Sequence, residues 1–149
     1  MATRGLPAWP WANAEVVALP PAEGLLLEAI RRWNTAVRDG TQPLLAMRPP
    51  LIAEDAGEAA LPLDRLLSAT TVSGFPAIGC VLCPRTTKDE AKLLLAMALA
   101  QSGCRSQALG LLLRHLSPTV AYAMMPTVLQ LGAALRSAGI LLTNPLRWP

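Results

Sequence analysis

Two cysteines separated by two residues, Cys80 and Cys83, have the types and spacing that point most directly to chemistry in this chain. The spacing C-x-x-C suits a tetrahedral metal site built from thiolates, for which zinc is the typical ion. It equally suits a redox dithiol whose first sulfur is activated near a helix N-terminus. Ordinary half-buried cysteines without chemistry are the third interpretation. The sequence leaves all three open. They differ in whether the two sulfurs face each other across a polar site or point separately into the core.

The zinc hypothesis needs four ligands, and the chain offers few beyond this pair. Cys104 and His115 carry the remaining thiol and the only imidazole. A helix over residues 87–103 would rise about 25 Å, which takes Cys104 far from Cys83. His115 returns on the following helix, but the fourth ligand would have to be a carboxylate such as Asp89 or come from a second subunit. We therefore predict zinc only as an alternative, and no other cofactor.

No other pattern in the chain predicts catalysis. His115 is the only histidine and no acidic residue follows Glu90, which argues against a two-histidine metalloprotease motif and against a Ser-His-Asp triad. The glycines form neither a dinucleotide fingerprint nor a phosphate loop. We therefore predict a protein that is not an enzyme, with no catalytic residues, and interpret His115 as a residue at a helix end.

The cysteine pair precedes the clearest helix start in the chain. Thr87 and Glu90 have the spacing of a capping box, and the next ten residues contain a single polar side chain. This pattern predicts a buried helix over residues 87–103. A second helix over 106–116 makes an αα-hairpin with it, and a third is expected over 119–138.

Upstream of the cysteines the pattern is less regular. Apolar residues recur at spacings of three and four over 22–39, which predicts an amphipathic helix with Arg31 on its polar face. Three prolines predict that residues 41–61 are irregular, with one helical turn at most. Residues 62–71 have the pattern of a short helix. Extended backbone is expected over 70–79, with room for one short strand pair.

These elements predict an all-α protein, a single compact domain of about five helices around an αα-hairpin core. Hydrophobic residues make up 52% of the chain and aromatic residues 4%, so aliphatic side chains and alanine, which favour helix, have to fill the core. We place the helical domain at residues 22–149. Residues 1–21 form an extended Pro- and Trp-rich N-terminal arm, because their four prolines exclude a regular helix.

Both ends of the chain are too apolar to be left in water. Trp9 and Trp11 in the arm and Trp148 in the tail predict docking into a groove, either of this chain or of a partner. In the absence of a catalytic pattern we predict a non-enzymatic protein-interaction module, such as an accessory subunit, an adaptor or a chaperone-like protein. Its partner would be another protein or a second copy of the chain. A metal-binding or redox-sensing protein that uses the cysteine pair is the alternative.

Charge is divided unevenly along the chain. Residues 1–90 hold 8 basic and 10 acidic residues, a balance of −2, whereas residues 91–149 hold 5 basic and no acidic residues, a balance of +5. This acid-free half makes a nucleic-acid-binding regulator a further alternative. The net charge of +3 is mild for such a protein, and the 106–116 helix offers few polar side chains for base edges, so nucleic acid is not the favoured partner.

The sequence predicts neither a membrane span nor export. The uncharged run 116–135 is long enough to cross a bilayer, but its two prolines and four polar residues favour a buried soluble helix. The N-terminus is interrupted by prolines and lacks the apolar stretch of a secretory signal. With three cysteines, an odd number, we predict a reduced, cytoplasmic setting.

Overall fold

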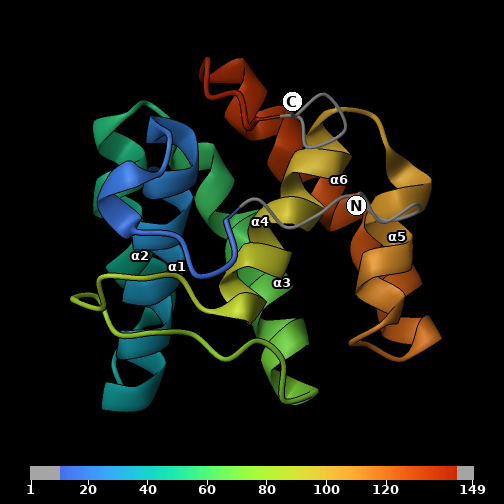
Figure 1. Cartoon of the computed structure of the whole chain (residues 1–149), viewed down its shortest axis with the longest axis horizontal. Coiled ribbons are helices and arrows are strands. Elements are labelled where there is room, and N and C mark those ends of the chain that lie inside the picture. The colour runs from blue at the N-terminus through green and yellow to red at the C-terminus, as the bar shows by residue number, and fades with distance from the viewer. Residues whose placement is uncertain (1–10, 144–149) are drawn as a thin grey trace.

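The apolar helix that follows the cysteines, α4 (Lys88–Gln101), lies in the middle of an all-helical fold (Figure 1). The computed structural model describes residues 11–143. From Glu90 to the end of α4 every side chain is buried except that of Lys92, as the sequence predicted. The other helices are α1 (Pro21–Asp39), α2 (Pro43–Ala53), α3 (Ala60–Val72), α5 (Arg105–Leu113) and α6 (Pro118–Ser137), with short 3-10 helices at Val16–Ala18 and Gly57–Ala59. The described residues thus form six α-helices and no strand, which confirms the all-α prediction.

The helices pack around α3 and α4. α1 packs against α2, α4 forms the predicted hairpin with α5, and α6 lies against α3 and α4. In Figure 1, α1 and α2 stand together at the left, α5 lies at the right, and α3 and α4 lie between them. Fully buried leucines from four helices meet in the core, among them Leu26, Leu66, Leu94 and Leu131. The core is therefore aliphatic, as the composition required.

The uncharged run 116–135, which the sequence analysis compared with a membrane span, overlaps α6. Ser117 caps this helix, with its Oγ accepting a hydrogen bond from the Val120 N–H at 3.4 Å, and Pro126 lies inside it. Only part of its surface is buried against its neighbours. Across residues 11–143, no helix has both the length and the apolar character needed to cross a membrane.

The prediction that residues 41–61 are irregular is wrong, because α2 forms there. Pro49 and Pro50 lie inside the helix and lack a backbone N–H, and a proline in a helix interior costs about 3 kcal/mol. Burial opposes this cost. Met47 and Leu51 are fully buried, and burying two such side chains contributes about 3–6 kcal/mol. Two such prolines cost about 6 kcal/mol, so the burial that accompanies packing of α2 against α1 is of the same order as their cost.

The extended backbone predicted from residue 70 begins later, because α3 continues to Val72. β-branched residues disfavour a helix when their side chains have no local partner. Here the hydroxyls of Thr70 and Thr71 donate to the carbonyls three residues earlier, at 3.0 and 3.2 Å. Thr70 is also fully buried. These contacts hold the last turn of α3 in helical form.

The described end of the N-terminal arm docks onto the loop between α3 and α4. Trp11 is 8% exposed and belongs to the core. The Val16 N–H donates to the Pro84 carbonyl at 2.8 Å. Glu15 and Arg85 form an isolated antiparallel bridge, which is the only strand-like pairing in the described part of the chain. Residues 70–79, where the sequence left room for one short strand pair, form none, and the arm pairs with the loop instead.

Candidate functional site

Cys80 and Cys83 lie in one tight turn of the loop between α3 and α4. The Cys83 N–H donates to the Cys80 carbonyl at 3.1 Å, and the Cys80 N–H donates to the Cys83 Sγ at 3.2 Å. The two Sγ atoms are 2.7 Å apart, with one thiol donating to the other. A disulfide bond is about 2.05 Å long, so bond formation needs a further approach of about 0.7 Å. The sulfurs face each other and do not point separately into the core.

Exposure and charge distinguish the two sulfurs. Cys80 is exposed and Cys83 is half-buried. The pKa of Cys80 is lowered, first by the hydrogen bond from the Cys83 thiol and then by the Leu82 and Cys83 backbone and the charge of Arg31. The pKa of Cys83 is raised, chiefly because its proton is held by the Cys80 sulfur. Cys80 is therefore the more acidic and more accessible thiol, with Cys83 behind it.

A buried ion pair beneath the loop joins α1 to α4. Arg31 and Glu90 are only 2% and 0% exposed. Two bonds connect them, from Nε to Oε2 at 2.8 Å and from Nη2 to Oε1 at 3.0 Å. The hydrogen bond to Glu90 is the main reason that the pKa of Arg31 is raised. Charge-assisted, bidentate contacts of this kind fix the orientation of both side chains.

The same ion pair holds both ends of the cysteine turn. Arg31 Nη1 donates to the Cys83 carbonyl at 2.7 Å, and Nη2 donates to the Arg85 carbonyl at 2.9 Å. Glu90 Oε2 accepts from the Gly79 N–H at 3.0 Å. A Cβ at position 79 would lie 3.2 Å from Arg31 Nη2, so glycine lets the backbone approach the guanidinium. The turn is thus attached to the core through one arginine and one glutamate.

Glu90 also caps α4, as the capping-box pattern predicted. The Thr87 Oγ1 accepts from the Glu90 N–H at 3.0 Å, and Glu90 Oε1 accepts from the Thr87 N–H at 2.7 Å. The Thr87 hydroxyl donates in turn to the Ala77 carbonyl at 2.7 Å. One carboxylate therefore starts the helix, balances the charge of Arg31 and holds the loop.

The N-terminal arm supports the loop through Thr86. The Thr86 hydroxyl accepts from the Ala14 N–H at 3.0 Å and donates to the Trp11 carbonyl, and its own N–H donates to the Ala14 carbonyl at 2.9 Å. Arg85 Nη1 donates to the Asn13 carbonyl at 2.9 Å. The segment after the cysteines is thus held by α1, α4 and the arm, while the Cys80 side chain stays open to solvent.

Within residues 11–143, no group of three or more His, Cys, Asp and Glu side chains is placed to hold a metal ion. Cys104 is half-buried against the core at the far end of α4, a helix about 21 Å long. His115 follows the end of α5, as predicted, and stacks on Phe75 with ring centroids 4.3 Å apart. Burial lowers its pKa, which favours the neutral imidazole. The described residues thus offer the cysteine pair but not the four ligands of structural zinc, and zinc stays a prediction.

Of the three tryptophans predicted to bind a partner, the structure describes Trp11. The groove that Trp11 fills belongs to its own chain, because the side chain is part of the core. Trp9 and Trp148 lie outside the described residues. Partner binding by the tryptophans therefore stays a prediction.

Two cations of the acid-free half are already engaged within the chain. Arg136 donates to the Gln101 carbonyl at 2.7 Å, and Lys92 pairs with Asp89 at 3.7 Å. These contacts do not test nucleic-acid binding, which stays a prediction to be checked by its salt dependence.

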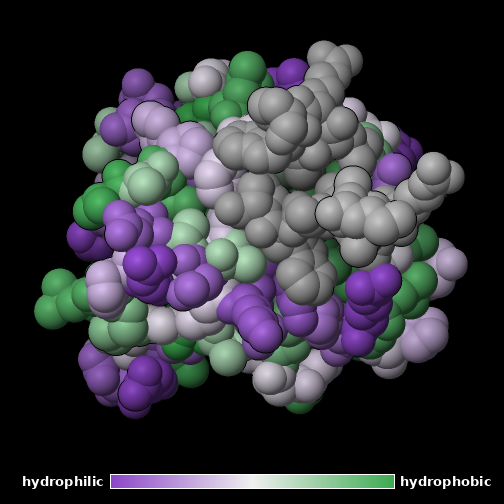
Figure 2. Space-filling view, in the orientation of Figure 1, coloured by the Kyte–Doolittle hydropathy of each residue, from purple (hydrophilic) through white to green (hydrophobic). Residues whose placement is uncertain are grey.

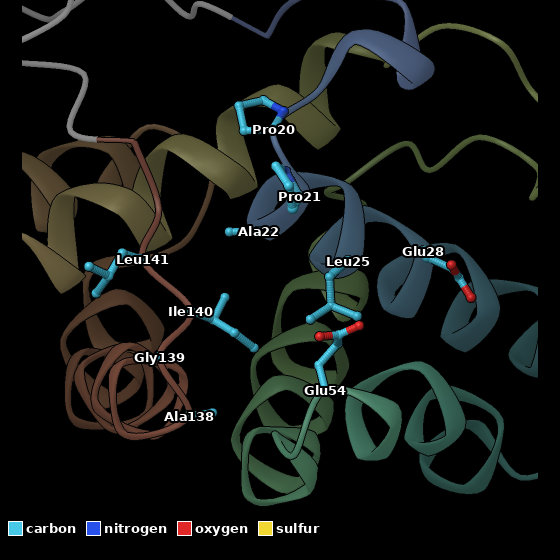
Figure 3. Close-up of a pocket in the computed structure, with 10 residues that line it drawn as sticks. All are labelled: Pro20, Pro21, Ala22, Leu25, Glu28, Glu54, Ala138, Gly139, Ile140 and Leu141. Carbon is cyan, nitrogen blue, oxygen red and sulfur yellow. The ribbon is translucent and has the colours of Figure 1, made fainter.

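A hollow of about 610 Å³ opens where the start of α1, the end of α2 and the segment after α6 meet (Figure 3). Its walls are prolines and aliphatic side chains, joined by the carboxylates of Glu28 and Glu54. Glu28 is paired with Arg32 at 2.9 Å. Neither cysteine lines this hollow. Its lining residues include no cysteine, serine, threonine or histidine that could act as a nucleophile or base.

Sequence reasoning missed Arg31, which it placed on the polar face of its helix. One local signal was present, because Arg31 follows the buried Leu27 by four residues and so lies on the same stripe of α1. Its partner Glu90 is 59 residues away, and no local pattern predicts a pair at that separation. The contact that positions the cysteines therefore appears only in the folded chain.

The unequal pKa values predict unequal reactivity. At pH 7 we expect an alkylating reagent such as iodoacetamide to modify Cys80 before Cys83, because only thiolates react and the pKa of Cys80 is the lowered one. In a Cys83→Ala variant the donor to the Cys80 sulfur is gone, so the pH midpoint of Cys80 alkylation should rise. Peptide mapping across a pH series measures both. Equal rates at the two positions, or an unchanged midpoint in the variant, would contradict this interpretation.

Comparison of the chain with protein-family models, with curated proteins and with solved structures found no match in any of the three. Any function has therefore to be inferred from the site itself.

Proposed function

We propose that the protein is a thiol–disulfide protein in which Cys80 and Cys83 alternate between a dithiol and an intramolecular disulfide. The observation that carries this proposal is the 2.7 Å separation of the two sulfurs, in a turn held by buried side chains. Redox sensing was an alternative in the sequence-based prediction, behind the interaction module. The facing sulfurs are the reason for placing it first.

The oxidant in this proposal is a disulfide of a second molecule. The Cys80 thiolate attacks one of its sulfurs, which forms a mixed disulfide and releases the other half as a thiolate. The Cys83 thiolate then attacks the Cys80 sulfur, which forms the intramolecular bond and releases the second half. The protons lost by the two cysteines end on the two released thiolates. A dithiol reductant runs the same steps in reverse.

The surroundings of the cysteines fit these two roles. Cys80 is exposed and its pKa is lowered, as the attacking thiol requires. Cys83 is half-buried and within bonding reach, as the resolving thiol requires. The charge of Arg31 favours the thiolate at both positions. Two thiols complete this reaction, whereas a structural zinc site would need further ligands.

The proposal is tested by counting thiols before and after oxidation. With excess hydroxyethyl disulfide we expect the number of free thiols to fall from three per chain to one. Peptide mapping should then identify a disulfide bond between Cys80 and Cys83. Metal analysis of the same preparation separates this result from zinc, because thiols protected by zinc are released by a chelator and not by a reductant. Three free thiols after treatment, or a bond that includes Cys104, would argue against the proposal.

A non-enzymatic interaction module is the second candidate function. The observation that favours it is a set of large apolar side chains left almost fully exposed, namely Val17, Val72 and Leu82. Such side chains are favourable contacts for a partner surface or a second copy. We expect stable association, seen by light scattering over a concentration series. A monomer at every concentration that also recovers no partner on pull-down would exclude it.

A further inference from the structure

We propose that the molecule joined to Cys80 in the mixed disulfide is a protein segment with apolar residues beside its cysteine, and that this segment lies along α1. The inference rests on the proposed thiol–disulfide function and names the substrate class of the same site. It follows from what surrounds the cysteine turn.

The turn presents apolar side chains to any partner of Cys80. Val81 and Leu82, between the cysteines, are 47% and 89% exposed. In Figure 1 this loop projects at the left edge of the molecule, and in the same orientation Figure 2 shows hydrophobic surface projecting there. A mixed disulfide holds the Cα atoms of its two cysteines about 5.5–6 Å apart. The neighbours of the partner's cysteine are therefore brought against Val81 and Leu82.

Two hollows beside the turn give the rest of the segment a place to lie. One, of about 310 Å³, is lined by Val16 and Leu27 together with the charged side chains of Glu28, Arg31 and Arg32. The other, of about 510 Å³, is lined by small apolar residues such as Ala46 and Pro49 together with the polar side chains of Thr35, Asp39 and Thr41. Both are also lined by Val81 and Arg32, so they adjoin each other at the cysteine turn.

The length of these hollows fits a peptide. Their lining residues on α1 run from Gly24 to Asp39, which is about 22 Å along the helix. An extended chain covers that distance with about seven residues. A segment with its cysteine near the middle therefore has hollows available on both sides of the mixed disulfide.

The charges around the hollows select neither an acidic nor a basic partner. Glu28 pairs with Arg32 at 2.9 Å, and Arg31 is satisfied by Glu90. Asp39 adds one carboxylate to the second hollow. Opposite charges thus balance along the surface, and the exposed Val81 and Leu82 are what favours an apolar disulfide over a hydrophilic one there. A small hydrophilic disulfide would gain none of this contact.

The test compares two synthetic peptides of equal length, each dimerised through one central cysteine. One has leucine on both sides of the cysteine and the other has serine. We measure how fast each oxidises the reduced full-length protein, and divide by its rate with dithiothreitol to remove differences in intrinsic reactivity. The normalised rate should be on the order of tenfold higher for the leucine peptide, because apolar area is buried as the mixed disulfide forms.

Two variants test whether the higher rate with the leucine peptide depends on the apolar side chains of the cysteine turn. In the double variant Val81→Ser, Leu82→Ser the rate ratio should fall towards one. Tyr122→Ser, which removes an exposed apolar side chain from α6, should keep the ratio of the unmodified protein. Equal rates for the two peptides, or a ratio unaffected by the double variant, would overturn the inference. If neither peptide produced a Cys80–Cys83 disulfide, the proposed function itself would fail.

Discussion

Replacing Glu90 with alanine is expected to lower the free energy of unfolding by about 3–5 kcal/mol, because it leaves the buried charge of Arg31 without its partner. For a chain of this size, the melting temperature falls by about 2–4 °C for each kcal/mol. The same change removes the acceptor for the Gly79 N–H and one half of the capping box of α4. Thermal and urea unfolding of the reduced protein measure the loss.

The matched control is Glu28→Ala, which breaks the ion pair with Arg32. The distances are nearly equal, 2.9 Å here and 2.8 Å between Arg31 and Glu90, but Glu28 and Arg32 are both exposed. An exposed pair one helical turn apart contributes about 0.3–0.5 kcal/mol. If the two substitutions cost the same, burial is not what makes the Arg31–Glu90 pair important.

Single substitutions of the two cysteines are expected to stop the exchange reaction at different stages. Cys83→Ser should stop it after the first step, with one half of hydroxyethyl disulfide bound to Cys80 as a stable mixed disulfide and the other half released as mercaptoethanol, because no resolving thiol follows. Cys80→Ser should remove the attacking thiol and leave the half-buried Cys83 largely unmodified. The protein without substitutions should carry no adduct, because Cys83 completes the reaction. Intact-protein mass spectrometry distinguishes the three outcomes.

Cys104 is the internal control for this experiment. It lies at the far end of α4, so Cys104→Ser should leave the adduct pattern unchanged in every background. If Cys80→Ser and Cys83→Ser accumulated adducts at equal rates, the two thiols would not have different roles.

The sequence predicted the elements that carry strong local signals. The capping box at Thr87 and Glu90 and the apolar run after it gave α4 its start and its central position, and both are present in the structure. Local sequence signals gave the wrong prediction where tertiary packing determines whether a helix forms. Pro49 and Pro50 favoured an irregular segment, but a helix forms there, with Met47 and Leu51 buried and α2 packed against α1.

The candidate site was only partly predictable, for a related reason. The spacing of Cys80 and Cys83 was visible in the sequence, but whether the sulfurs face each other depends on the path of the loop. That path is set by Arg31, which lies more than 50 residues from the carbonyls it binds. The position of Arg31 four residues after Leu27 is a local signal for burial, but it does not predict the partner, because Glu90 is supplied by another helix.

The central claim is that Cys80 and Cys83 form a reversible disulfide, and its reduction potential tests this most directly. The full-length protein is equilibrated in two series of buffers, of graded reduced and oxidised glutathione and of graded reduced and oxidised dithiothreitol, then quenched with an alkylating reagent and mapped at all three cysteines. We predict one two-electron transition that involves Cys80 and Cys83 and leaves Cys104 alkylated throughout. Its midpoint should lie above about −300 mV, because exposed, exchangeable disulfides are less resistant to reduction than structural ones. Three alkylated cysteines in every buffer, or a Cys80–Cys83 bond that no dithiothreitol ratio reduces, would contradict the claim.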